Sequence, residues 1–135
     1  GFVLADDEYY YVTRGVWNKN LQDVIKVANV AGSNGEWWYV KNGKADFNAN
    51  TVAENSSGWW KITNGRADFG YTGIAQNSNG WWYCEDGKVN FRFSGFAENE
   101  NGWWYVEDGR VKFDKSTVIK GRVDGKNGWW YVKRS

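Results

Sequence analysis

The chain has 135 residues and a net charge of +1, from 17 basic and 16 acidic side chains. This balance argues against a nucleic-acid partner, which demands a basic excess, and no apolar run approaches the ~20 residues that a membrane-spanning helix needs. The sequence contains 11 Trp, 8 Tyr, 7 Phe and 17 Gly, without Pro, Met or His. Aromatic residues and glycine together favour short strands joined by tight turns.

Taken from the N-terminus, the first 30 residues contain a weak copy of a motif that later recurs strongly. The segment at Tyr9-Tyr10-Tyr11-Val12 aligns with Trp37-Trp38-Tyr39-Val40. We therefore interpret residues 1–30 as a degenerate capping repeat and residues 31–135 as the tandem array, within a single repeat domain.

Trp-Trp pairs mark the repeats. They begin at Trp37, Trp59, Trp81, Trp103 and Trp129; the first three intervals are 22 residues and the last is 26. An Asn-Gly or Asp-Gly dipeptide follows four of these pairs, at Asn42, Asn64, Asp86 and Asp108. Such dipeptides tolerate positive φ at both central positions of a two-residue type I′ turn. The sequence thus predicts an all-β fold, a solenoid of tandem β-hairpin repeats of about 22 residues.

The turns fix which side chains share a face, because side chains alternate along a strand. Around Asn42-Gly43, Val40 is expected opposite Ala45, and Trp38 opposite Phe47. The predicted core face therefore carries these residues and their equivalents: Trp60, Ile62, Ala67, Phe69; Trp82, Cys84, Val89, Phe91; and Trp104, Val106, Val111, Phe113. The segments Gly73-Ile74-Ala75 and Gly95-Phe96-Ala97 are interpreted as connectors between hairpins.

The first Trp and the Tyr of each repeat fall on the opposite, mixed face. Flat aromatic rings with polar neighbours suit sugar rings, and they would equally suit a quaternary ammonium through cation–π attraction. The candidate ligand-binding residues are Trp37, Tyr39, Trp59, Trp81, Tyr83, Trp103, Tyr105, Trp129 and Tyr131. The alternative is that these rings pack between successive hairpins.

Other chemistries find little support. Without His there is no Ser-His or Cys-His pair and no His metal ligand, so we predict no catalytic site, no metal site, no cofactor and no enzyme activity. Cys84 is expected to be a buried apolar residue. The basic column Lys44, Arg66, Lys88 and Arg110 either touches an acidic wall polymer or pairs with local acids beside the turns.

The motifs Gly80-Trp81-Trp82-Tyr83 with Asp86-Gly87, and Gly102-Trp103-Trp104-Tyr105 with Asp108-Gly109, resemble the choline-binding and glucan-binding repeats of Gram-positive surface proteins. They are also similar to the C-terminal repeats of clostridial toxins. The resemblance covers nearly the whole chain from about Asp7. It implies a β-hairpin solenoid, secreted to the bacterial cell surface.

The resulting hypothesis is a non-catalytic module that binds a cell-wall polymer or another glycan and anchors or targets a larger secreted bacterial protein. Repetition of one surface favours such binding, because several weak sites on one polymer give tight overall attachment. The alternative is a structural spacer or adhesive protein-interaction repeat without a glycan ligand. An exposed aromatic strip could also support a homodimer.

Overall fold

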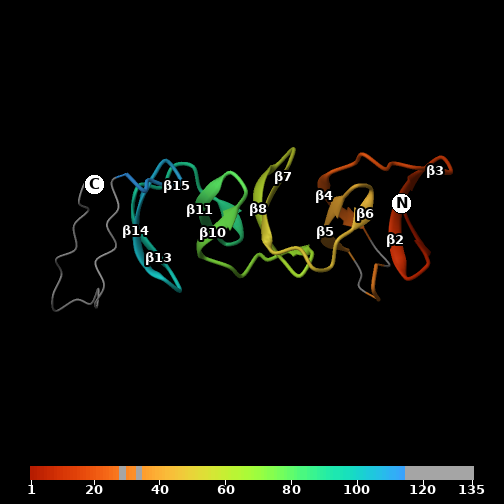
Figure 1. Cartoon of the computed structure of the whole chain (residues 1–135), viewed down its shortest axis with the longest axis horizontal. Helices are drawn as coiled ribbons and strands as arrows, with labels where there is room; N and C mark the ends of the chain where they lie inside the picture. The colour runs from red at the N-terminus through yellow and green to blue at the C-terminus, as the bar shows by residue number, and fades with distance from the viewer. Residues whose placement is uncertain (28–29, 33–34, 115–135) are drawn as a thin grey trace.

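The computed structural model describes residues 1–27, 30–32 and 35–114, and within these residues the protein is all-β. The strands form one elongated antiparallel sheet, and successive hairpins follow one another along the long axis of the molecule (Figure 1). The predicted fold class is confirmed. The described residues contain no helix that is long and apolar enough to cross a membrane. The strands are β1 (Phe2–Ala5), β2 (Glu8–Thr13), β3 (Val16–Trp17), β4 (Asp23–Val27), β5 (Glu36–Lys41), β6 (Lys44–Ala45), β7 (Thr51–Asn55), β8 (Gly58–Thr63), β9 (Arg66–Ala67), β10 (Gly73–Asn77), β11 (Gly80–Glu85), β12 (Lys88–Val89), β13 (Gly95–Asn99), β14 (Gly102–Glu107) and β15 (Arg110–Val111).

The predicted hairpin turns and their register are confirmed. At Asn64-Gly65 the two φ angles are 49° and 85°, and Ile62 pairs with Ala67 across the turn. The turns at Asn42, Asp86 and Asp108 have the same signs of φ. Positive φ at both central residues explains why Asn or Asp is followed by Gly at each of these positions.

The interpretation of the segments between hairpins as connectors is wrong, because they are strands. In one repeat, β10 pairs with β11 along its whole length, from Gly73 opposite Cys84 to Asn77 opposite Gly80. Strands β4, β7 and β13 pair with β5, β8 and β14 in the same way. The pairing satisfies the main-chain groups on one edge of each Trp-Trp strand, which would otherwise lack partners away from water. Each repeat is therefore a three-stranded meander with the Trp-Trp strand in the middle.

Adjacent repeats are joined through the turn glycine. Gly65 donates its N–H to the carbonyl of Ala49 (2.9 Å), in the loop before β7 of its own repeat, and its carbonyl accepts from the N–H of Tyr39 (2.7 Å) in the preceding repeat. A Cβ atom added at Gly65 would lie 2.3 Å from the Asp46 carbonyl oxygen. This distance is shorter than real Cβ atoms show, so a side chain at this position would clash with the preceding repeat. The same two hydrogen bonds and the same close approach recur at Gly43, Gly87 and Gly109.

The apolar core lies at the junctions between repeats. The predicted core positions Val40, Ile62, Cys84 and Val106 are fully buried. The expectation that Cys84 is a buried apolar residue is therefore confirmed. The connector strands add Val52, Ile74 and several alanines to the core. A typical cluster joins Val24 and Tyr39 of one repeat to Ala53 and Ile62 of the next. Each repeat therefore completes the core of its neighbour, as expected for a solenoid.

The predicted core face is wrong at its Phe position, and on the mixed face Tyr39 follows the alternative of packing between hairpins. Tyr39, assigned to the mixed face, is only 6% exposed. Phe69, Phe91 and Phe113, assigned to the core face, are 49%, 44% and 48% exposed. Tyr39 packs with Val24, Ala53 and Ile62 at the junction with the next repeat, whereas each of these Phe residues lies beyond the two-residue second strand of its hairpin.

The docked glycines offer a direct test of this architecture. Gly15 occupies the corresponding turn near the N-terminus with φ of 77°, but no described atom lies within 4 Å of the point that a Cβ would occupy. Replacement of Gly15 by Ala should cost about 1–2 kcal/mol of folding free energy, from left-handed backbone strain alone. Replacement of Gly65 by Ala adds a steric clash, so we expect a loss of about 3 kcal/mol or more. Urea unfolding of both variants measures the difference; equal losses would contradict the proposed docking.

Candidate functional site

The aromatic side chains gather at the junctions between repeats, in sets of three. Trp59 lies with its ring centre 4.9 Å from Trp82 and 5.6 Å from Phe91, both in the next repeat. Trp81 lies 5.0 Å from Trp104 and 5.2 Å from Phe113 in the same arrangement. Each junction cluster thus combines the first aromatic of one repeat with the second indole and the terminal Phe of the next. Among the described residues the junction clusters are Tyr9/Trp38/Phe47, Trp37/Trp60/Phe69, Trp59/Trp82/Phe91 and Trp81/Trp104/Phe113.

One junction cluster is open. Trp60 contacts Phe69 edge-on at 5.6 Å, but Trp37 has no ring contact with either of them in the described part of the chain. The three rings instead line an apolar pocket of about 190 Å³, together with Val24, Ser57 and Ala67. No charged side chain lines this pocket. It is therefore a small aromatic cavity between two repeats.

Asparagine side chains hold the second indole of each pair in place. The Asn77 amide oxygen accepts the indole N–H of Trp82 (2.9 Å) and the main-chain N–H of Asn79 and Gly80, while its amide N–H donates to the Val52 carbonyl. Asn55 and Asn99 bind Trp60 and Trp104 in the same way. The sequence motif did not reveal this role, although an asparagine stands five residues before each of these indoles. The Trp38 indole N–H is buried and has no hydrogen-bond partner among the described residues.

A basic side chain from the next repeat lies over each second aromatic ring. The Lys88 ammonium is 5.4 Å from the Trp60 ring centre, and the Arg110 guanidinium is 5.3 Å from that of Trp82. Lys44 over Tyr10 and Arg66 over Trp38 repeat the contact. The strand register causes this arrangement, because each of these rings stands directly opposite the following basic residue.

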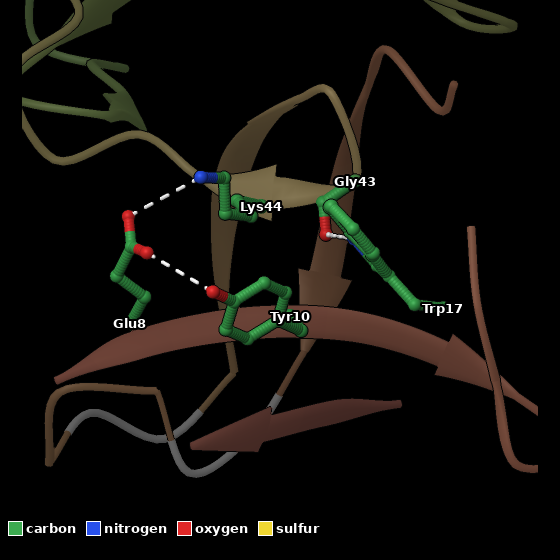
Figure 2. A network of polar contacts seen from close by, with 5 residues as sticks. All are labelled: Glu8, Tyr10, Trp17, Gly43 and Lys44. Atoms are coloured by element: carbon green, nitrogen blue, oxygen red, sulfur yellow. Dashed lines mark hydrogen bonds and ion pairs between the residues drawn. The ribbon is translucent and has the colours of Figure 1, made fainter. Parts of the chain in front are cut away.

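The acids beside this basic column change along the array. Glu8 accepts a hydrogen bond from the Tyr10 hydroxyl and forms an ion pair with Lys44 at 3.4 Å; Figure 2 shows this network, with the Trp17 indole donating to the Gly43 carbonyl. Glu36 pairs with Arg66 at 2.8 Å. Gly58 and Gly80 occupy the corresponding positions in the next two repeats. Lys44 and Arg66 thus pair with acids of the preceding repeat, 36 and 30 residues earlier in the chain, and not with the local acids beside their own turns that the sequence suggested.

Among the tyrosines of the predicted site, Tyr39 is buried, whereas Tyr83 and Tyr105 are half-buried like the first indoles of their repeats. The Tyr39 hydroxyl accepts a hydrogen bond from the Gln22 amide (3.3 Å), and burial raises its pKa. Tyr83 stacks on Phe93 at 4.0 Å, and Tyr105 contacts Phe96 edge-on. In the third repeat Lys61 replaces this tyrosine; it donates to the Ile62 carbonyl and the Thr63 hydroxyl, and desolvation lowers its pKa.

The structure therefore separates the predicted site residues into groups. Trp37, Trp59 and Trp81 belong to junction clusters, whereas the partner rings of the half-buried Trp103 would belong to the following repeat. Trp129 and Tyr131 lie outside the described residues. Within the described residues no group of three or more His, Cys, Asp or Glu side chains could hold a metal ion. Burial raises the pKa of the Cys84 thiol to about 12, so this thiol is protonated and unreactive at neutral pH.

Comparison with known families agrees with this repeated geometry. The choline-binding repeat model matches five segments, residues 30–46, 48–68, 70–90, 92–112 and 120–134, which together span well over half of the chain. The chain belongs to the choline-binding repeat family. Searches of curated proteins and of solved structures returned no match.

Three of the matched segments, residues 48–68, 70–90 and 92–112, coincide with three-stranded units of the described chain. The segment 70–90, for example, runs from the loop before β10 through the Trp-Trp strand β11 to β12. The family repeat thus includes the strand that was interpreted from the sequence as a connector. Three of the four junction clusters combine indoles from two successive matched segments, and the Phe of each cluster directly follows a matched segment, so a site of this kind requires tandem copies.

The asparagine that orients the second indole should contribute measurably to stability. Replacement of Asn77 by Ala leaves the buried Trp82 N–H and the Val52 carbonyl without a partner, which costs about 2 kcal/mol. The matched variant Asn20→Ala changes an exposed asparagine that forms no described side-chain bond, and should stay within about 0.5 kcal/mol of the parent. Urea unfolding followed by tryptophan fluorescence compares the two. A loss at Asn77 no larger than at Asn20 would contradict the assigned role.

Proposed function

We propose that this protein is a wall-binding module that holds quaternary ammonium groups of a choline-bearing polymer in its junction clusters, and that it anchors a larger secreted protein at the bacterial cell surface. The observation that supports this proposal most directly is the open junction between Trp37, Trp60 and Phe69. Membership of the choline-binding repeat family supports the same ligand. No catalytic step is part of the proposal.

The chemistry of the pocket suits a trimethylammonium group. Aromatic faces attract a cation by about 0.5–1 kcal/mol each at exposed sites, and by about 2 kcal/mol where the cation is desolvated. The methyl groups of such a cation would also contact the apolar walls formed by Val24 and Ala67. A primary ammonium or guanidinium would lose its hydration without gaining hydrogen bonds, since Ser57 is the only polar residue in the lining.

The junction clusters differ in whether their rings must separate before this ligand can enter. In the Trp59 and Trp81 clusters the rings already touch one another, with centres about 5 Å apart. A cation can enter these clusters only if the rings separate, which sacrifices their mutual contact of about 0.5–1.5 kcal/mol. We therefore expect the Trp37 junction to bind first and most tightly. Several such sites along one polymer would then give strong overall attachment.

Substitution of exposed phenylalanines tests which junction cluster binds choline most tightly. Phe69→Leu keeps an apolar side chain but removes one aromatic face from the open junction. It should weaken the tightest choline site about fivefold, equivalent to about 1 kcal/mol. Phe91→Leu should leave that site unchanged, because Phe91 belongs to a closed cluster. Phe96→Leu is the matched control, since Phe96 is exposed and belongs to no junction cluster.

Isothermal titration with choline chloride, and in parallel tryptophan fluorescence, provides the measurement. An unchanged tightest site in Phe69→Leu would exclude this pocket as the ammonium site. Absence of any choline binding by the parent protein would instead favour the spacer or adhesive role, in which the rings serve only to pack the repeats.

A further inference from the structure

We propose that Lys61 is a built-in cation, whose ammonium occupies an aromatic groove between two repeats and excludes the ammonium group of a ligand from it. The inference rests on the proposed function and deepens it, because it names a residue that decides which spaces between repeats are open to the ligand. The groove has a volume of about 430 Å³. Its lining includes Lys61, Tyr71, Ile74, Ala75 and Trp81, and we name it the Lys61 groove.

The half-buried Lys61 side chain places its ammonium against an aromatic ring. The ammonium is 5.3 Å from the centre of the Tyr71 ring, and it donates hydrogen bonds to the Ile62 carbonyl (2.9 Å) and the Thr63 hydroxyl (2.8 Å). The Thr63 hydroxyl in turn donates to the Asp68 carboxylate (2.9 Å). An aromatic face, two acceptors and a nearby carboxylate together compensate an ammonium for the water that it loses. The groove therefore contains a complete cation site, and its cation belongs to the chain.

The ring that receives this ammonium is held at both ends. The Tyr71 hydroxyl donates to the Ile74 carbonyl, and the Tyr71 main-chain carbonyl accepts from the N–H of the turn glycine Gly87 (2.8 Å). The second of these bonds belongs to the set that positions each turn glycine. A cation in this groove therefore meets an aromatic face whose position the main chain has set.

The neighbouring repeats fill the equivalent space without a cation. One repeat later, Tyr83 stacks on Phe93 with ring centres 4.0 Å apart. One repeat earlier, the residue equivalent to Tyr71 is Ala49, so Tyr39 has no second ring beside it at this place. Of these three repeats, only the middle one places a positive charge against a ring. The substitution of lysine for tyrosine therefore changes the occupant of the groove from a ring to an ammonium.

This arrangement prevents a second cation from using the groove. A ligand ammonium would have to share the Tyr71 face with Lys61, and like charges at such a short separation repel each other. Displacement of the lysine would instead cost both hydrogen bonds of its ammonium. The open junction at Trp37 differs in this respect, because no charged residue lines its pocket. Lys61 therefore directs a ligand ammonium away from its own groove and leaves the open junction accessible.

The test compares the full chain with its Lys61→Met variant, which keeps an unbranched apolar side chain and removes the charge. The probe is tetramethylammonium chloride, followed by NMR. Carbon-13-labelled tyrosine rings report on Tyr71, and the indole N–H resonance of Trp60 reports on the open junction. In the parent, Tyr71 should not respond at concentrations that saturate Trp60. In Lys61→Met, Tyr71 should respond saturably, with a Kd at least about tenfold below the lower limit found for the parent.

Two further variants separate the charge at position 61 from the net charge of the chain. Lys61→Arg retains a cation in the groove and should behave like the parent. Lys19→Met is the matched control, because it removes the same charge from an exposed lysine that makes no described polar contact. Its Tyr71 resonances should remain as unresponsive as those of the parent. If Lys61→Met does not fold, Lys61→Gln replaces it with the same expected result.

Three results would overturn the inference. The first is a Tyr71 response in the parent at the concentrations that saturate Trp60. The second is an equal Tyr71 response in Lys61→Met and Lys19→Met. The third is a loss of stability in Lys61→Met without any new binding, which would assign the lysine a purely structural role. Absence of a Trp60 response in every chain would refute the proposed function, whereas the comparison of Tyr71 between variants would still decide the role of Lys61.

Discussion

The architecture depends on the close contact between the glycine of each turn and the main chain of the preceding repeat. A residue at this position must combine positive φ with space for a neighbouring carbonyl oxygen at the place where a Cβ would stand. Only glycine meets both demands. The contact sets the distance and rotation from one repeat to the next, because the glycine carbonyl accepts a main-chain hydrogen bond from the preceding repeat while its N–H is bound by the loop before the first strand of its own repeat. At Gly87, for instance, these bonds run to Tyr71 and from Lys61.

The aromatic sites follow from this contact. Once the turn glycine is docked, the residue after it stands opposite the second aromatic residue of the preceding repeat, and at the Trp59 and Trp81 junctions the first indole meets the second indole of the next repeat. Trp59 and Trp82 approach each other for this reason, although they are separated along the chain and in different hairpins. The clusters are thus a consequence of main-chain docking, and the rings fill a space whose dimensions the main chain has set. A ring can change identity, as Tyr9 does, without loss of the junction.

Some features of the structure could be predicted from the sequence and others could not, and the reason is physical. Turn type and register follow from local chemistry, so Asn64-Gly65 and the pairing of Ile62 with Ala67 were predictable from a few residues. Burial depends on the next repeat, which the alternation of one strand does not encode. Phe69 was therefore assigned to the wrong environment, and packing of Tyr39 between repeats was left as one of two alternatives. The connector strand at Gly73–Asn77 was missed because its glycine and alanine resemble a link, whereas its Asn77 is the residue that signals the second hairpin bend.

A repeated main-chain framework also allows side chains at equivalent positions to differ in charge and openness. Glu8 and Glu36 neutralise the basic residue that lies over their neighbouring ring, whereas Gly58 and Gly80 leave Lys88 and Arg110 without such an acid at that position. The Lys88 chain instead packs closely against Gly58, and Arg110 donates to the Asn79 carbonyl. The repeats are therefore equivalent as building units and different as surfaces. A polymer bound along this array would meet a graded series of sites, and its position on the array would depend on which groups it carries.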